Sequence, residues 1–259
     1  MYSSIFIFSL LLAIRGLALY YMLKYKKIFE NSDFIIINKP AGLLTHGNDH
    51  IKELTLVDQL LKDNPGIAKI GEDPIRPGIM HRLDRQVSGL LAIAKTQDAF
   101  DHLKKQFQKR AVKKIYTGLV YGKIEQDEDE INFPIKRSAK GYKMAALPFT
   151  EKGGLNQRGK PAITNFKIIK KFINYTLLEI KIKTGRMHQI RVHMAAYGHP
   201  LVGDDLYGTK KGREKNKKIN LGRIFLAANK LSFLDPDGKK QSFEIDLPDE
   251  LKTFLKQTK

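Results

Sequence analysis

The chain has 259 residues, of which 46 are Lys or Arg and 27 are Asp or Glu, giving a formal net charge of +19. Hydrophobic residues make up 42% of it, a balance that excludes a disordered tail, a collagen and a membrane-embedded bundle. The absence of cysteine excludes disulfides, thiolate metal sites, iron–sulfur clusters and cysteine nucleophiles. The excess positive charge favours a polyanionic partner, with nucleic acid ahead of an anionic membrane.

The apolar stretch from Ile5 to Leu23 has two interpretations. It approaches the roughly 20 residues that a membrane-spanning helix needs, but Arg15 would lie near its centre, at a cost of roughly 2.5–3.5 kcal/mol. The alternative is that translation starts at Met22, which we favour, so we expect no stable membrane association. Both interpretations predict an N-terminal extension over residues 1–27, a single globular domain over residues 28–259 and a cytoplasmic location for that domain.

The first half of the predicted domain alternates strands with helices. The apolar runs 34–37 and 90–94 predict buried strands. Residues 55–61 have leucines at helical spacing, and a second helix is expected to begin at the N-cap Thr96 and to continue through Phe107. The outer face of this second helix is predicted to be basic, with Lys104, Lys105, Lys109 and Arg110.

The second half is richer in strands. Alternation of apolar and polar residues predicts strands at 115–121, 166–169 and 176–184. A helix is expected at 189–197, followed by Gly198 as its C′ residue. The acidic run 127–130 and the very basic run 210–218 are predicted to be loops. These elements favour the α+β class, with a mixed, largely antiparallel central sheet flanked by helices in a single domain.

The first candidate functional cluster is the polar run from His81 to Gly89, just before an apolar strand. Arg82 and Arg85 flank Asp84, and a nearby cation favours the ionised form of a carboxylate. An ionised carboxylate that faces a pocket can act as a nucleophile or a general base. Alternatively, Asp84 caps a turn through its side chain and has no chemical role. Spacing alone leaves both interpretations open.

The second cluster is the run 185–193, at the start of a predicted helix. His188 and Arg191 are three residues apart and share a helix face, and a helix N-terminus attracts phosphate or carboxylate groups. The alternative is a basic face that is merely solvated. A metal site would have to use His188, His193 and His199, whose spacing suits shared coordination poorly. We therefore predict no metal.

The third cluster is Lys113-Lys114-Ile115-Tyr116. A tyrosine on a strand commonly packs half-buried against its neighbours. Beside lysines in a protein of charge +19, Tyr116 is also a candidate platform for base stacking.

Taken in order, these clusters and their flanking segments resemble the RluA-type family of pseudouridine synthases. The signature segment of the family resembles His81-Arg82-Leu83-Asp84 followed by Ser88-Gly89-Leu90-Leu91. Further similar segments are 33–44, Lys114-Ile115-Tyr116, Lys160-Pro161-Ala162 with Thr164, 184–208 and 223–233. The resemblance covers about residues 30 to 248, nearly all of the predicted domain.

This resemblance implies a pseudouridine-synthase-like catalytic domain that isomerises uridine in RNA to pseudouridine without a cofactor or a metal. Asp84 would be the nucleophile and Arg191 its ion-pair partner. Tyr116 would stack on the uracil and assist proton handling. Val87 departs from the family, which usually has Thr at this position, and leaves the nucleophile unchanged.

The RNA has to deliver a uridine that is extruded from a stem or already in a loop. The residues expected to bind the RNA are His81, Arg82, Arg85, Arg186, His188, Gln189, Lys104 and Lys105. Contacts from the basic runs 104–110 and 210–218 to phosphates would make binding fall steeply with salt.

Large-subunit ribosomal RNA is the commonest substrate in the family and is the expected partner, with transfer RNA as the alternative. The competing classes are a non-catalytic RNA-binding factor of ribosome assembly and a membrane-tethered protein. We expect a monomer.

Overall fold

The computed structural model of the chain describes residues 23–47, 53–138, 141, 143–148 and 158–259. Nearly all of the apolar segment 5–23 lies outside these residues, so both of its interpretations stay open. Within the described ranges, the helices are all too short or too polar to cross a membrane. The first strand, β1, already begins at Lys26, and the division of the chain at residue 28 stays a prediction.

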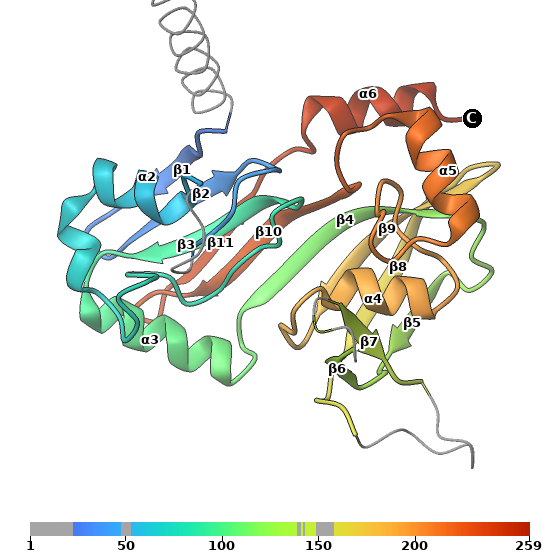
Figure 1. Cartoon of the computed structure of the whole chain (residues 1–259). Coiled ribbons are helices and arrows are strands. Elements are labelled where there is room, and N and C mark those ends of the chain that lie inside the picture. Colours follow the sequence, from blue (N-terminus) through green and yellow to red (C-terminus); the bar gives the residue numbers. More distant parts are fainter. Residues whose placement is uncertain (1–22, 48–52, 139–140, 142, 149–157) are drawn as a thin grey trace, which may run out of the picture.

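A nine-stranded sheet forms the centre of the fold (Figure 1). In spatial order its strands are β1 (Lys26–Glu30), β2 (Phe34–Lys39), β3 (Ser88–Ala94), β10 (Leu226–Leu234), β4 (Lys113–Tyr121), β9 (Tyr175–Ile182), β8 (Thr164–Lys171) and β5 (Glu128–Ile131), with β11 (Lys240–Glu244) paired to β10. Strands β6 (Ile135–Arg137) and β7 (Met144–Ala146) form a separate hairpin. Among the described strands only β3 and β10 run parallel, which confirms the predicted mixed, largely antiparallel sheet.

Helices cover both faces of this sheet. They are α2 (Leu56–Asp63), the 3-10 turn η1 (Pro65–Lys69), α3 (Gln97–Gln108), α4 (Gln189–Ala196), α5 (Lys210–Ile219) and α6 (Asp249–Gln257). Thr55 caps α2 in a reciprocal capping box with Asp58. Thr96 caps α3 as the sequence predicts, because its hydroxyl accepts a hydrogen bond from the backbone N–H of Ala99.

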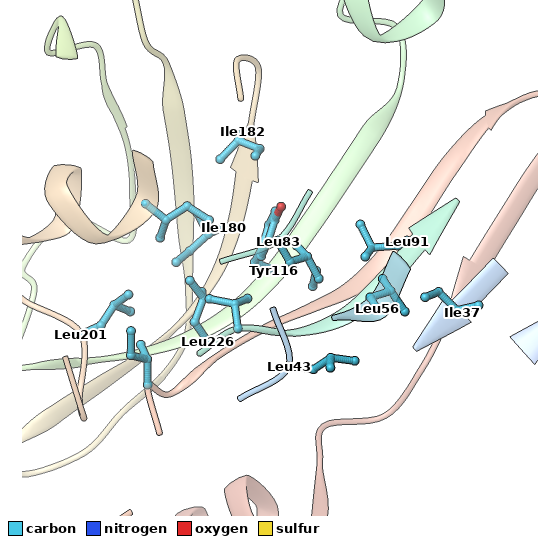
Figure 2. Packing of buried hydrophobic residues seen from close by; sticks show 14 of the residues in the cluster. Ile37, Leu43, Leu56, Leu83, Leu91, Tyr116, Ile180, Ile182, Leu201 and Leu226 are labelled. Atoms are coloured by element: carbon cyan, nitrogen blue, oxygen red, sulfur yellow. The ribbon is translucent and has the colours of Figure 1, made fainter. Parts of the chain in front are cut away.

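The alternation of side chains along β4 divides the core into two layers. Tyr116 and Val120 lie on the face that packs against α2 and α4, and Figure 2 shows Tyr116 together with the buried side chains of that layer. Leu119 lies on the opposite face, in a cluster with Leu251 of α6. The position of Tyr116 therefore follows from the two-residue period of its strand.

Two predicted loops are regular elements instead. The acidic run 127–130 lies mostly in the edge strand β5, where Glu128 pairs opposite Lys167 of β8 and Glu130 forms an ion pair with Lys183 at 2.8 Å. Lysines across the strand offset the acidic charge there. The basic run 210–218 is helix α5, whose N-cap Thr209 accepts a hydrogen bond from the N–H of Gly212.

The parallel contact between β3 and β10 depends on a glycine. Gly89 has a φ of +130°, and a Cβ atom at this position would lie 2.1 Å from the carbonyl oxygen of Ala228. Such a distance is a severe clash, so a side chain cannot be placed there without moving one of the strands. Gly89 thus sets the approach of β10 to the strand that follows the Asp84 segment.

Candidate active site

The three sequence clusters meet in a cleft of ≈ 580 Å³. The cleft is lined by the segment that precedes β3, by the end of α3, by β4 and by the start of α4. In Figure 1 helices α3 and α4 lie on either side of β4. Asp84, Tyr116 and Arg191 all belong to the lining, so residues more than 100 positions apart in sequence share one site.

Asp84 lies at the first residue of a tight turn in which the N–H of Val87 donates to the Asp84 carbonyl at 3.0 Å. Its side chain is 19% exposed and accepts a hydrogen bond from Nη1 of Arg191 at 3.3 Å. Val87 is buried in the apolar core. An apolar side chain therefore suits the position where the family usually has Thr, because no buried hydroxyl needs a partner there.

The arginines beside Asp84 in sequence contact other groups. Arg82 donates to Nε2 of His46 at 2.9 Å, and Arg85 pairs with Glu53 at 2.6 Å and donates to the carbonyl of Gly42. Among the described residues, the cation in contact with Asp84 is Arg191. The sequence predicted that Arg82 and Arg85 are the cations next to Asp84. That prediction is wrong, because the cation in contact with Asp84 is Arg191.

Arg191 is held by a second carboxylate, which no sequence pattern singled out. Its Nε and Nη2 donate to the two carboxylate oxygens of Asp204, at 2.8 and 3.0 Å. Asp204 is 1% exposed and also accepts from the N–H groups of Leu206 and Tyr207. Burial opposes the charge of Arg191, but the hydrogen bonds and charge of Asp204, followed by the charge of Asp84, outweigh it and raise its pKa.

Tyr116 is 7% exposed, and its ring belongs to the core while lining the cleft. Burial raises the pKa of its hydroxyl, and the negative charge of Asp84 adds to that shift. The hydroxyl therefore remains protonated at neutral pH, where it can donate a hydrogen bond.

His188 occupies the start of α4 in a left-handed backbone conformation, with φ of 55°. Its Nδ1 lies 2.8 Å from the hydroxyl of Tyr207, which itself accepts from the N–H of Met144 at 2.9 Å. Burial lowers the pKa of His188, so the ring is neutral at neutral pH, and the hydrogen bond between Nδ1 and the Tyr207 hydroxyl fixes its orientation. The Tyr207 ring also lies 5.2 Å from the Arg191 guanidinium carbon, within reach of a cation–π contact.

His81 and Gln189, two of the predicted RNA-binding residues, direct their polar side-chain atoms into the protein. Nε2 of His81 accepts from the N–H of Ala92 at 3.0 Å, its ring stacks on Phe107, and burial lowers its pKa to about 3. Gln189 is buried and uses both ends of its amide, accepting from the Thr184 hydroxyl at 2.7 Å and donating to the carbonyl of Ile163 at 3.0 Å. Both residues line the cleft, where they support its walls.

The remaining predicted RNA-binding residues differ in their access to the cleft. Arg82, Lys104 and Arg186 line it. Lys104 forms an ion pair with Glu72, and Nε of Arg186 donates to the carbonyl of Pro161. Lys105 is exposed on α3, and neither it nor Arg85 is part of the lining.

Beneath the Asp84 turn, Arg223 joins three parts of the chain. Its Nη2 donates to the hydroxyl of Ser88 at 2.7 Å and to the carbonyl of Leu226 at 3.1 Å, while Nη1 pairs with Glu250 at 2.7 Å. Arg223 is 8% exposed, so these partners replace its hydration. The start of β3 is thereby fixed to β10 and to α6.

The histidines considered for a metal site are bound elsewhere. His193 is completely buried, with Nε2 donating to the carbonyl of Phe133 and Nδ1 facing the hydroxyl of Thr164. His199 contacts the carbonyl of Tyr121. No cluster of three potential metal ligands of the His, Cys, Asp or Glu type occurs within the described part of the chain.

Residues 33–196 match a family described as RNA pseudouridylate synthase. Ribosomal large subunit pseudouridine synthase D of Nitrosomonas europaea is 38% identical over 234 residues, which cover 89% of this chain and 64% of that protein. An uncharacterized RNA pseudouridine synthase of Chloroflexus aurantiacus is 40% identical over 222 residues, or 85% of this chain and 65% of that protein. The chain spans 61% to 70% of the length of three such relatives.

Solved structures show the same fold. Human RNA Pseudouridylate Synthase Domain Containing 1 has a TM-score of 0.67 and 27% identity, over 88% of this chain and 84% of that one. Human RNA Pseudouridylate Synthase Domain Containing 4 has a TM-score of 0.72 over 95% of this chain and 97% of that one, and at 21% identity it shows likeness of fold alone.

Proposed function

Because the chain belongs to the RNA pseudouridylate synthase family, we propose that it isomerises uridine in RNA to pseudouridine, with Asp84 as the nucleophile. The observation that carries the proposal is the meeting of Asp84, Tyr116 and Arg191 in one cleft. A protein that merely binds RNA would have no need of a carboxylate held by a buried guanidinium beside a buried tyrosine.

The reaction requires no change in overall composition. The bond between N1 of the uracil and C1′ of the ribose breaks, a bond from C5 to C1′ forms, C5 loses a proton and N1 gains one. Asp84 supplies the nucleophile toward the uridine from a turn whose orientation Arg191 maintains at 3.3 Å. A carboxylate held in this way needs little reorganisation during the reaction.

Tyr116 provides the surface on which the uracil stacks. Its ring is held by the core and lines the cleft, and aromatic rings of this kind bind splayed-out bases without needing a particular sequence. Since burial keeps its hydroxyl protonated, Tyr116 would assist proton handling as a hydrogen-bond donor rather than as a base.

The dimensions and charge of the cleft support an extruded nucleotide. A volume of ≈ 580 Å³ lies within the roughly 300–1,000 Å³ of typical small-molecule pockets. Arg82, Arg186 and Lys104 contribute positive charge to its lining. Extruding a base costs a few kcal/mol, and contacts of these residues to the RNA would offset that cost.

The proposed substrate is large-subunit ribosomal RNA, and the proposed location is the cytoplasm. Relatives named ribosomal large subunit pseudouridine synthase D, from Nitrosomonas europaea and Neisseria meningitidis, are 36% to 38% identical to this chain. The exposed lysine of α3 and those of α5 would bind phosphates outside the cleft. Modification of a transfer RNA is the alternative that the experiment distinguishes.

The test is pseudouridine mapping of total RNA from cells lacking the gene, complemented with wild type, Asp84→Asn or Asp237→Asn. Asp237→Asn is a matched control, because Asp237 is exposed in the turn between β10 and β11. We expect wild type and Asp237→Asn to restore specific sites and Asp84→Asn to restore none, with RNA binding retained. If Asp84→Asn restores the sites, Asp84 is not the nucleophile. If the pseudouridine map of the deletion strain equals that of wild type, the proposed isomerisation of uridine is contradicted.

A further inference from the structure

A second cavity of ≈ 220 Å³ adjoins the cleft. It lies between the end of α3 and the segment that leads from β9 into α4, and it shares Phe107, Lys114 and Arg186 with the lining of the cleft. Its lining includes four cationic side chains, from Arg110, Lys114, Lys183 and Arg186, and none of the described residues that line it is acidic.

Three of these cations lack a carboxylate partner in the described structure. Lys183 pairs with Glu130, whereas Arg110, Lys114 and Arg186 take part in no salt bridge among the described residues. Like charges placed together without counter-charge repel one another, and the repulsion grows as water is excluded. The cavity is therefore complementary to an anion.

Lys114 is the most enclosed of the three unpaired cations. Its ammonium lies 5.3 Å from the ring centre of Phe107, and burial lowers its pKa to about 8. It is still mainly charged at neutral pH. Across the cavity, Gly185 has no side chain, and a Cβ atom there would lie 3.7 Å from the Lys114 ammonium, so the glycine leaves room beside the charge.

We propose that this cavity, the phosphate pocket, binds a phosphate of the RNA backbone next to the uridine in the cleft. Lys114 and Arg186 border both spaces, so the strand that delivers a base to Tyr116 passes the pocket. Phosphodiester oxygens accept charge-assisted hydrogen bonds from ammonium and guanidinium groups. That the base next to this phosphate is the uridine to be modified rests on the proposed function. That the pocket binds an anion does not.

The first test measures binding of a 20-nucleotide oligouridylate at several salt concentrations. We expect Lys114→Met, which keeps the apolar stem, to weaken binding roughly tenfold and to reduce the salt slope by about 0.7, the value for one phosphate contact on a single strand. Lys114→Arg should retain most of the affinity. Lys256→Met is the matched control, because Lys256 is exposed on α6 and lines neither cavity.

A second variant, Arg110→Gln, covers the case in which Lys114→Met unfolds, since Arg110 is exposed. It should weaken binding in the same direction. If the folded pocket variants bind oligouridylate with the affinity and salt slope of wild type, the phosphate pocket is wrong.

The second test replaces single phosphates by neutral methylphosphonates in a hairpin that carries the mapped uridine. At one linkage beside that uridine, the substitution should weaken binding to wild type and leave binding to Lys114→Met unchanged, because this variant no longer holds that phosphate. Additive losses at every linkage would overturn the assignment. If wild type forms pseudouridine but the effect of the methylphosphonate does not depend on Lys114, the phosphate pocket is contradicted and the proposed function is not. If wild type modifies no RNA, the proposed function fails, and the oligouridylate result decides the pocket separately.

Discussion

Arg191 donates two hydrogen bonds to Asp204, at 2.8 and 3.0 Å, and a longer one, at 3.3 Å, to Asp84. The bidentate contact fixes the plane of the guanidinium, and Nη1 then faces Asp84. Because Asp204 is buried and accepts two backbone N–H groups, it is itself firmly placed. We infer that Asp204 is a positioning residue, which acts on Asp84 through Arg191.

Replacing Asp204 should impair the reaction more than the binding of RNA. In Asp204→Asn the amide nitrogen would face a guanidinium that needs an acceptor, so Arg191 would shift. Misplacement of a catalytic group by about 1 Å can cost roughly 100-fold, and we expect a fall of that order in kcat with a much smaller change in KM. Steady-state kinetics on the mapped RNA measures both.

The neighbouring Asp205→Asn is the matched control for this change. Asp205 accepts a hydrogen bond from Asn216, and no contact joins it to Arg191 in the described structure. Wild-type kcat in a folded Asp204→Asn variant would show that Asp84 is positioned without Asp204.

Gly89→Ala should destabilise the protein severely. Both its positive φ and the 2.1 Å approach to the carbonyl of Ala228 oppose a side chain. Gly238→Ala separates these two causes, because Gly238 has φ of +79° and no atom within 4 Å of the added Cβ. We expect Gly238→Ala to lower the free energy of unfolding by about 1–2 kcal/mol, from its positive φ alone. Gly89→Ala should lower it by at least about 3 kcal/mol. Urea unfolding measures both, and equal losses would contradict the steric explanation.

Acid should destabilise the fold through His193. Burial lowers the pKa of His193 to about 4, whereas the unfolded chain binds this proton near the ordinary pKa of about 6.5. The stabilising effect of the neutral ring is thus complete above pH 6.5 and is lost as the pH falls toward 4. Between pH 6 and pH 5 the expected loss is about 1 kcal/mol.

The variant His193→Gln isolates this contribution. It should be less stable than wild type at pH 6, because the hydrogen bonds to Phe133 and Thr164 change. Its free energy of unfolding should nevertheless fall by about 1 kcal/mol less than that of wild type between pH 6 and pH 5. Parallel losses in the two proteins would show that other groups dominate the acid response.

Helix α5 should contribute to RNA binding through charge alone. Its exposed lysines Lys210, Lys211, Lys217 and Lys218 line no part of the cleft that holds Asp84. Changing these four to Gln should weaken RNA binding and lower the salt slope, by up to about 0.7–0.9 for each phosphate that the helix no longer binds. The matched control changes the exposed Lys239, Lys240, Lys256 and Lys259 to Gln. If the salt slopes of RNA binding are equal in the two variants, the weaker binding results from the lower net charge and not from the loss of contacts with α5.

Local pattern was enough to predict five strands of the sheet (β2, β3, β4, β8 and β9) and the helices at α2, α3 and α4. It failed for α5, because six cations in ten residues resemble a solvated loop. That helix depends on tertiary contacts: the amide oxygen of Asn216 accepts from the Tyr121 hydroxyl at 2.6 Å and from the N–H of Gly203 at 2.9 Å. Packing against a distant strand stabilises a sequence whose like charges oppose helix formation.

The sequence predicted residues that line the cleft, but it did not predict the hydrogen bonds that hold them. The family resemblance supplied Asp84, Tyr116 and Arg191, and all three line the cleft. Spacing could not reveal that Asp204 rather than Asp84 is the main partner of Arg191, because both carboxylates reach it from other segments. Nor could it show that His81 and Gln189 form hydrogen bonds within the walls of the cleft.

Strand β10 lies between β3 and β4 at the centre of the sheet, although it is one of the last strands in chain order (Figure 1). Until residues 226–234 have been synthesised, the strand after Asp84 and the strand of Tyr116 have no shared neighbour to bring them into register. During translation, therefore, the earlier segments cannot assemble the cleft by themselves. A nascent chain would carry Asp84, Tyr116 and Arg191 well before the cleft that brings them together has formed.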